Sequence, residues 1–255
     1  MQVLAVTSQK GGAGKTTTAV NVAAALGERG TRVLVVDLDP QCSASLWLGA
    51  REDGRGLLDV FTGSTPLRAL VRETAVSGVS VVPASPWLVG VDRLVAGEPG
   101  AETIFRRAVQ SLPADWDLVL LDCPPSLGLL SVSALVAAAS VVVPVEASAL
   151  GLAGLSGLLS TVETVKDRLN PTLAVGAILA CRVDTRTNLS KDVVDELRRR
   201  FPALTLKTTI RESVRLREAW SFAQPVTTYA PTSSGAEDYR AVAAELLTRL
   251  RRTRV

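Results

Sequence analysis

Residues 10–17, Lys-Gly-Gly-Ala-Gly-Lys-Thr-Thr, carry the strongest chemical signal in this chain. They stand between a short apolar run at 2–7 and an Ala-rich segment at 15–29, an order that predicts a strand, a loop and a helix. Glycines let backbone N–H groups approach a phosphate, and a helix N-terminus adds partial positive charge. We predict that this loop binds nucleotide phosphates through Gly11, Gly12, Ala13, Gly14, Lys15, Thr16 and Thr17.

Within this loop, Lys15 would place its charge at the β- and γ-phosphates, and Thr16 would offer a hydroxyl to Mg²⁺. The strict pattern G-x-x-x-x-G-K-[ST] is not met, because its first glycine falls on Gln9. A second lysine, Lys10, instead stands five residues before Lys15. The alternative is a Gly-rich turn that contains Gly-Lys-Thr by chance.

Three carboxylates end two further apolar runs. Asp37 and Asp39 close the run at 31–37, and Asp122 closes the run at 118–122. A carboxylate at a strand end beside Mg²⁺ and the γ-phosphate can orient the attacking water or hold a metal-bound water. We predict Asp122 as a metal-binding carboxylate, and the residues alone leave Asp37 and Asp39 both open as carboxylates that act on the water. The alternative for Asp37 and Asp39 is that they cap the next helix.

The loops and carboxylates follow apolar runs that do not alternate with polar residues, and this pattern indicates a particular kind of sheet. Such runs suit parallel strands that are covered on both faces, and here they alternate with helical segments. We predict an α/β fold with a doubly wound, mostly parallel sheet flanked by helices, in one domain over residues 1–255. Ligands bind beyond the carboxyl ends of such strands. Residues 51–100 are expected to be a surface helix and connections.

Composition excludes several classes of site. The chain has no His, so imidazole-dependent nucleophile activation is excluded, and its three Cys are far apart with no C-x-x-C pair. We expect a cytoplasmic protein with no signal peptide. The charge-free stretch at 127–145 is interrupted by Ser131, Ser133, Ser140 and Pro144, which favours a helix and a buried strand over a membrane span. The tryptophans Trp47, Trp87, Trp116 and Trp220 are interpreted as core or cap residues.

Taken together, these segments resemble the deviant Walker A family of P-loop ATPases, in its ParA/Soj branch of DNA-partition proteins. The resemblance covers nearly the whole chain and lies in residues 10–26, 32–41, 118–135, 184–189, 214–219 and 234–239. It begins at the first strand, as in the short form without an N-terminal helix-turn-helix. The family implies ATP hydrolysis in a sandwich dimer, where Lys10 reaches the partner's nucleotide and Asp39 positions the attacking water. Lys15, Thr16 and Asp122 would hold phosphate and Mg²⁺.

Several positions depart from the family pattern. Family members usually read Asp-Pro-Gln-Gly-Asn, whereas Cys42 and Ser43 follow Gln41 here. A family Gln-x-Glu becomes residues 146–148, Glu-Ala-Ser, and the later Glu-Gly becomes Ala-Gly at 153–154. Residues that are often basic in the family are here Glu212 and Ser234.

The positive charge is concentrated towards the C-terminus. Residues 1–165 hold 11 Lys+Arg and 15 Asp+Glu, a net −4, whereas residues 166–255 hold 17 and 10, a net +7. Phosphate contacts of DNA need Lys or Arg but no particular bases. We predict Arg186, Arg215 and Arg217 as DNA-binding residues, with Lys191 and Arg211 behind them. The resemblance places DNA contacts at Arg186 and Arg215, and a solvated charged surface is the alternative.

The resemblance thus implies a Mg²⁺-dependent ATPase that forms an ATP-bound homodimer on nonspecific double-stranded DNA. With a ParB-like partner that stimulates hydrolysis, it would position a chromosome, a plasmid or another cargo at the nucleoid. The main alternative is a MinD-like positioning ATPase that cycles on membranes. The basic residues near the C-terminus follow a helix with little free apolar surface, so no stable membrane association is expected. A nucleotide-dependent ligase or reductase is a third class.

Overall fold

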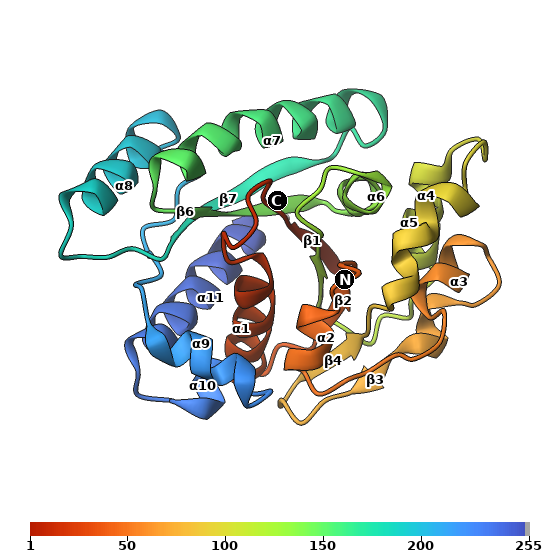
Figure 1. The fold of residues 1–255 in the computed structure, drawn as a ribbon, viewed down its shortest axis with the longest axis horizontal. Coiled ribbons are helices and arrows are strands. Elements are labelled where there is room, and N and C mark those ends of the chain that lie inside the picture. Colours follow the sequence, from red (N-terminus) through yellow and green to blue (C-terminus); the bar gives the residue numbers. More distant parts are fainter. Residues whose placement is uncertain (253–255) are drawn as a thin grey trace.

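The computed structural model describes residues 1–252 of the 255-residue chain (Figure 1). Its centre is a seven-stranded sheet in the order β3-β4-β2-β5-β1-β6-β7, parallel except for β3, which pairs antiparallel with β4. The predicted doubly wound, mostly parallel sheet is therefore confirmed. The strands are β1 (Gln2–Val6), β2 (Val33–Asp37), β3 (Arg72–Glu73), β4 (Val79–Val82), β5 (Leu118–Asp122), β6 (Ser140–Glu146) and β7 (Ala174–Cys181).

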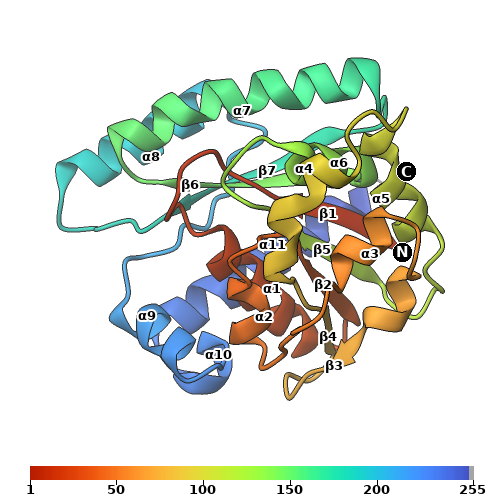
Figure 2. The same cartoon turned by 45° about the vertical axis from the view of Figure 1, so that its right-hand side comes forward.

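Helices cover both faces of this sheet, as Figures 1 and 2 show. They are α1 (Lys15–Gly27), α2 (Ser43–Trp47), α3 (Leu57–Phe61), α4 (Val91–Leu94), α5 (Ala101–Gln110), α6 (Leu129–Ala137), α7 (Ala149–Arg168), α8 (Asn188–Arg200), α9 (Val214–Ser221), α10 (Val226–Tyr229) and α11 (Ser234–Arg252), with 3₁₀ turns η1 (Leu67–Leu70) and η2 (Pro86–Gly90). One apolar cluster joins α5, α6, α7 and α8 to one face of the sheet, and a second joins α1 and α11 to the other.

The central strands explain the continuous apolar runs of the sequence. Every residue of β2, β4 and β5 is buried, because neighbouring residues pack on opposite covered faces. Leu34 and Val36 belong to one cluster, and Val33 and Val35 to the other. A single polar residue within such a strand has no route to solvent except at its end. The acidic side chains of these strands, Asp37 and Asp122, accordingly lie at the carboxyl ends of β2 and β5.

The charge-free stretch at 127–145 forms α6 and most of β6, as predicted. Within residues 1–252, none of the helices is long and apolar enough to cross a membrane. The segment at 51–100 contributes α3, η1, β3, β4, η2 and α4. Its two-residue strand β3 was not predicted, because both of its residues are exposed and only pairing with β4 defines it.

The prediction that all four tryptophans are core or cap residues is wrong for two of them. Trp87 is 59% exposed and Trp220 is 48% exposed. Each lies on a short surface helix whose inward position is taken by a neighbour, Leu88 in η2 and Ala219 in α9. The other two, Trp47 and Trp116, are buried.

Candidate active site

The loop between β1 and α1 has the backbone geometry of a phosphate-binding turn. Gly12 and Gly14 adopt positive φ values of 77° and 93°, which residues with a side chain rarely adopt. Gly14 is the N-cap of α1, and among the described residues no side chain accepts a hydrogen bond from the first turn of this helix. The N-terminal amides of α1 are thus left for another partner, and the helix dipole favours an anion there.

Lys15 begins α1 and is only 7% exposed. Its ammonium makes no hydrogen bond or ion pair with any residue in the described range 1–252. Burial lowers the pKa of Lys15, and the nearby carboxylates of Asp122 and Asp39 offset part of this effect. A buried, unpaired ammonium is costly in an isolated fold, so its position is suited to an anionic ligand.

Asp122 ends β5 and is fully buried. In the described chain, neither of its carboxylate oxygens has a hydrogen-bond partner. Burial raises the pKa of Asp122 well above its usual value, and the charge of Asp37 raises it further, against the opposing effects of Thr16 and Lys15. Unsatisfied buried oxygens next to a hydroxyl call for a partner. Carboxylate and hydroxyl oxygens are ligands suited to Mg²⁺, so Asp122 and Thr16 fit a magnesium site.

Asp37 and Asp39 have different surroundings although they are two residues apart. Buried Asp37 accepts hydrogen bonds from the backbone N–H (2.8 Å) and hydroxyl (2.6 Å) of Ser45, and from the backbone N–H of Asp39 (3.1 Å). Burial raises its pKa to about 6, and the Ser45 contacts lower it in part. Asp37 therefore organises the loop that leads into α2, and it lies beside Asp122, its partner in the strand register.

Asp39 lies in that same loop and is nearly buried. One of its oxygens, Oδ1, accepts a hydrogen bond from the backbone N–H of Gln41 at 3.0 Å. This contact closes a local turn, as the capping alternative expects. The second oxygen, Oδ2, makes no hydrogen bond within residues 1–252. One carboxylate can therefore both shape the loop and offer an oxygen to another group.

Lys10 is the lysine of the loop that has partners in its own chain. Its ammonium contacts the Glu146 carboxylate at the end of β6 and lies 3.3 Å from the Ser148 hydroxyl. The other Glu146 oxygen accepts from Arg182 at 3.3 Å, and Arg182 also pairs with Glu212 at 3.8 Å. Glu146, Ser148 and Glu212 occupy departures from the family pattern, and only the fold shows that Glu146 and Ser148 meet Lys10.

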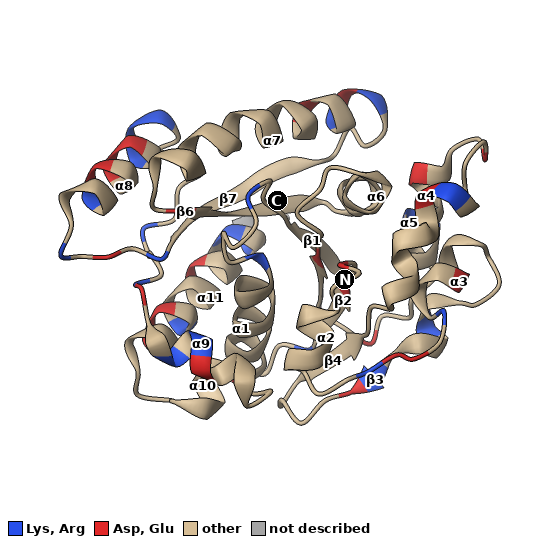
Figure 3. Ribbon diagram, viewed as in Figure 1, with Lys and Arg blue, Asp and Glu red and all other residues tan. Residues whose placement is uncertain are grey.

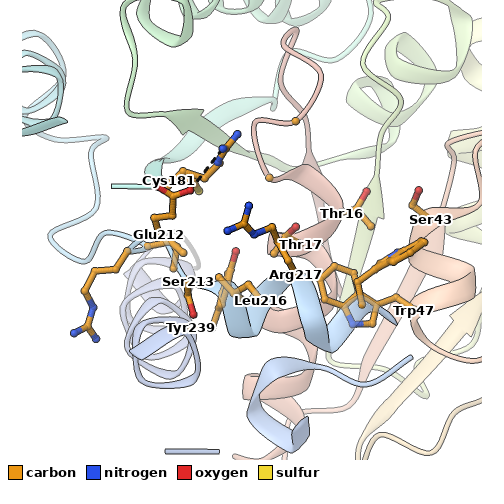
Figure 4. A pocket seen from close by; sticks show the side chains of 16 residues that line it. Thr16, Thr17, Ser43, Trp47, Cys181, Glu212, Ser213, Leu216, Arg217 and Tyr239 are labelled. Atoms are coloured by element: carbon orange, nitrogen blue, oxygen red, sulfur yellow. Dashed lines mark ion pairs between the residues drawn. The ribbon is translucent and has the colours of Figure 1, made fainter. Parts of the chain in front are cut away.

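A cavity of about 510 Å³ opens beside the loop (Figure 4). One wall is the turn at 12–17, and the opposite wall comes from the end of β7, residues 210–213 and α9. The sequence analysis singled out segments 214–219 and 234–239, which contribute to this opposite wall, but it did not predict that they face the loop. Its lining includes Ser43, Trp47, Cys181, Arg182, Ile210, Arg211, Glu212, Ser213, Leu216, Arg217, Trp220 and Tyr239.

The three predicted DNA-binding arginines do not share one environment. Arg186 precedes α8, is 85% exposed in its side chain and makes two contacts of 2.9 Å with Asp184. Arg215 is exposed on α9 and pairs with Glu218 at 2.7 Å. Arg217, two residues later, lines the cavity. Lys and Arg are interspersed with Asp and Glu over α8 and α9 in Figure 3, so the net positive region is not a surface of one sign.

Comparison with known proteins agrees with this geometry. A family model described as an AAA domain matches residues 1–175. The chromosome-partitioning ATPase Soj of Thermus thermophilus is 46% identical over 247 residues, which are 97% of this chain and 96% of that protein. The sporulation initiation inhibitor protein Soj of Bacillus subtilis is 39% identical over 247 residues, 96% of this chain and 98% of that one. The chain belongs to the ParA/Soj family of chromosome-partitioning ATPases.

Two solved structures similar to this ParA/Soj ATPase contain bound nucleotide. One, described as a cobyrinic acid a,c-diamide synthase from Mycobacterium smegmatis with an ATP analog and magnesium, is 34% identical with a TM-score of 0.86, over 98% of this chain and 96% of that one. The septum site-determining protein MinD from Pyrococcus horikoshii with Mg-ADP is 25% identical with a TM-score of 0.77, over 96% and 95%. The family thus agrees with the phosphate-binding chemistry of the loop.

Proposed function

We propose that this chain binds Mg²⁺-ATP at the loop of residues 10–17 and hydrolyses it to ADP and phosphate. The observation that carries the proposal is the pair of buried, unpartnered groups at one place, the ammonium of Lys15 and the carboxylate of Asp122. Lys15 contacts the β- and γ-phosphates, and backbone amides from Gly11 to Thr17 surround them. Thr16 and Asp122 hold Mg²⁺, which neutralises charge that develops on the phosphates.

Asp39 is the residue that we assign to hydrolysis. Its Oδ1 is held by the turn at Gln41, which fixes the carboxylate, while Oδ2 is available to accept a hydrogen bond from the attacking water. Asp37 is fully occupied by Ser45 and by the backbone of Asp39, so we assign it to holding this loop in place.

Hydrolysis takes place in an ATP-bound homodimer, in which Lys10 contacts the nucleotide of the partner subunit. Lys10 lies at the surface end of the loop, with 30% of its side chain exposed. In the single chain its charge is neutralised by Glu146. Dimer formation therefore replaces one anionic partner of Lys10 by another, the carboxylate by a phosphate, and the ammonium is never left unpaired.

The ATP-bound dimer binds double-stranded DNA without sequence preference at the nucleoid, and it positions a chromosome, a plasmid or another cargo with a ParB-like protein that stimulates hydrolysis. The excess of positive charge at 166–255 supports this. Arg186 and Arg215 are exposed, and each now pairs with a carboxylate close to it in sequence. Exposed ion pairs of this kind contribute little stability, so DNA phosphates can replace these carboxylates.

The structure offers less support for the MinD-like alternative, which needs an apolar surface to enter a membrane interface. On α11, Leu246 is buried, and Leu247 and Leu250 pack against the core formed with α1. The apolar residues near the end of this helix are thus engaged within the fold. For this reason we propose DNA, and not lipid, as the surface on which the protein acts.

The test compares binding of the protein to DNA with its binding to lipid membranes. Fluorescence anisotropy with duplexes of unrelated sequence, in ATP and in ADP, measures DNA affinity, and co-sedimentation with anionic liposomes measures lipid binding. We expect similar affinities for all duplexes in ATP, much weaker binding in ADP, and no lipid pelleting. ATP-dependent pelleting with liposomes, without DNA binding, would overturn the proposal in favour of membrane cycling.

A further inference from the structure

Arg217 differs from the other two arginines that line the cavity. Arg182 pairs with Glu146 and Glu212, and Arg211 makes contacts of 2.7 to 3.1 Å with Asp238 and Glu237. Arg217 makes no hydrogen bond or ion pair with any residue that the structure describes. The cavity is therefore lined by one guanidinium whose charge is not balanced by a neighbouring carboxylate.

The direction of this side chain is visible in Figure 4, where Arg217 points from α9 into the cavity, towards the side on which Thr17 lies. Thr17 belongs to the first turn of α1, whose amides have no side-chain cap from the part of the chain that the structure describes. Two positive features, the helix N-terminus and the guanidinium, thus face the same space from opposite walls. Such an arrangement recognises an anion between them.

We propose that Arg217 binds the nucleotide itself, at the α-phosphate and ribose side, in place of the DNA contact predicted from the sequence. The proposal rests on the proposed position of the phosphates at the 10–17 loop. Buried Lys15, at the start of α1, is assigned to the β- and γ-phosphates. Arg217 lines the same cavity as Thr17, together with apolar residues such as Leu216 and Trp220. We therefore assign the nucleoside and its α-phosphate to this part of the cavity.

This position also explains why Arg217 differs from Arg215 on the same helix. Arg215 is exposed and pairs with Glu218, which is typical of a surface charge whose position is not fixed by a ligand. Arg217 faces the cavity, so bound nucleotide would cover its guanidinium. A charge-assisted hydrogen bond to a phosphate oxygen is stronger than an exposed ion pair. The contact therefore contributes to nucleotide affinity in the single chain, before any dimer or DNA is involved.

Isothermal titration calorimetry of the full chain with ADP and with a non-hydrolysable ATP analogue tests this inference. Arg217→Gln should weaken both nucleotides by about tenfold, with the ratio of the two affinities unchanged, because the α-phosphate is common to both. Arg217→Lys should lie between this variant and the wild type. The control Arg199→Gln removes an exposed arginine of α8 that pairs with Glu196, and it should bind both nucleotides as the wild type does.

Three results would overturn the inference. One is wild-type affinity of Arg217→Gln for both nucleotides, and another is a loss confined to the ATP analogue, which would place the guanidinium at the γ-phosphate. The third is unchanged nucleotide affinity with weakened DNA binding at saturating ATP. Lys15→Ala is titrated beside them, since normal binding by that variant would show that the phosphates lie elsewhere.

Discussion

The phosphate-loop edge and the basic surface differ in how their charges are satisfied. At the loop, Lys15 and Asp122 are buried, and within residues 1–252 the Lys15 ammonium forms no ion pair and the Asp122 oxygens accept no hydrogen bond of good geometry, although their opposite charges and the Thr16 hydroxyl act on each other. On the surface, Arg186 and Arg215 are exposed and already hold carboxylates. The first region is incomplete without a ligand, whereas the second is complete without one.

This difference shows how strongly each region identifies its ligand. Leaving a buried charge or carboxylate without a partner is costly, so a fold retains one where a ligand supplies the missing contact. Exposed ion pairs contribute little and are screened by salt. Single residues should therefore decide nucleotide binding, while DNA binding should depend on the sum of many weak contacts.

The largest effect is expected from Lys15→Ala, which removes the buried ammonium while leaving the backbone of the loop. Nucleotide affinity should fall by at least about 30-fold, the loss expected for a charge-assisted contact in a buried site. Calorimetric titration with ATP measures it. Lys191→Ala, which removes an exposed lysine of α8, is the matched control. Equal affinities for the two variants would remove the contrast between the two regions.

Asp39→Ala should separate binding from turnover. The substitution removes the oxygen assigned to the water but no phosphate contact, so ATP binding and dimerisation should persist while kcat falls by about 100-fold or more. Light scattering with ATP and a phosphate-release assay measure the two properties. If Asp39→Ala turns over ATP at the wild-type rate, this carboxylate serves the turn at Gln41 alone.

Lys10→Ala and Glu146→Gln test Lys10, which is partly exposed and paired with a carboxylate, and so is intermediate between buried Lys15 and the exposed arginines. Without its ammonium, Lys10→Ala should bind ATP normally as a monomer and dimerise poorly. Glu146→Gln removes the charge that holds Lys10 in its own chain, so this variant should dimerise at a lower ATP concentration, by about threefold. Analytical ultracentrifugation over an ATP series distinguishes them. Wild-type dimerisation by Lys10→Ala would refute the role of Lys10 in the partner's site.

The smallest effect is expected from Arg215→Glu, because this arginine is one of many surface charges. DNA affinity should fall similarly for all sequences, and the log–log slope against salt should decrease by about 2, since each dimer loses two phosphate contacts. ATP-dependent dimerisation should be unchanged. Adding Arg186→Glu should weaken binding further. Loss of affinity for one duplex sequence only would contradict a nonspecific phosphate contact.

The fold and the loop could be predicted from the sequence because their signals are local. Each residue of β2 and β5 is buried between two covered faces, which requires the continuous apolar runs that the sequence shows. The acidic residues that end these strands come together because adjacent parallel strands end at one edge, as the register of Asp37 with Asp122 shows. Strand β3 could not be predicted, since two exposed residues carry no pattern.

The other wall of the site depends on contacts between distant segments. Glu146 meets Lys10 across 136 positions of sequence, and α9 brings Arg217 opposite Thr17 across the cavity. Nothing in the spacing of these residues marks the encounter. The sequence likewise cannot distinguish Arg215 from Arg217, because both side chains are exposed and only the orientation of α9 makes Arg217 line the cavity.

The most direct test of the whole account is the salt dependence of DNA affinity in the two nucleotide states. Anisotropy titrations of the wild-type protein with one duplex, at a series of salt concentrations, give the log–log slope in ATP and in ADP. We predict a linear slope in both states that is about twice as steep in ATP, because the dimer joins two basic surfaces on one DNA. Equal slopes and equal affinities in ATP and ADP would contradict the proposed order of nucleotide, dimer and DNA.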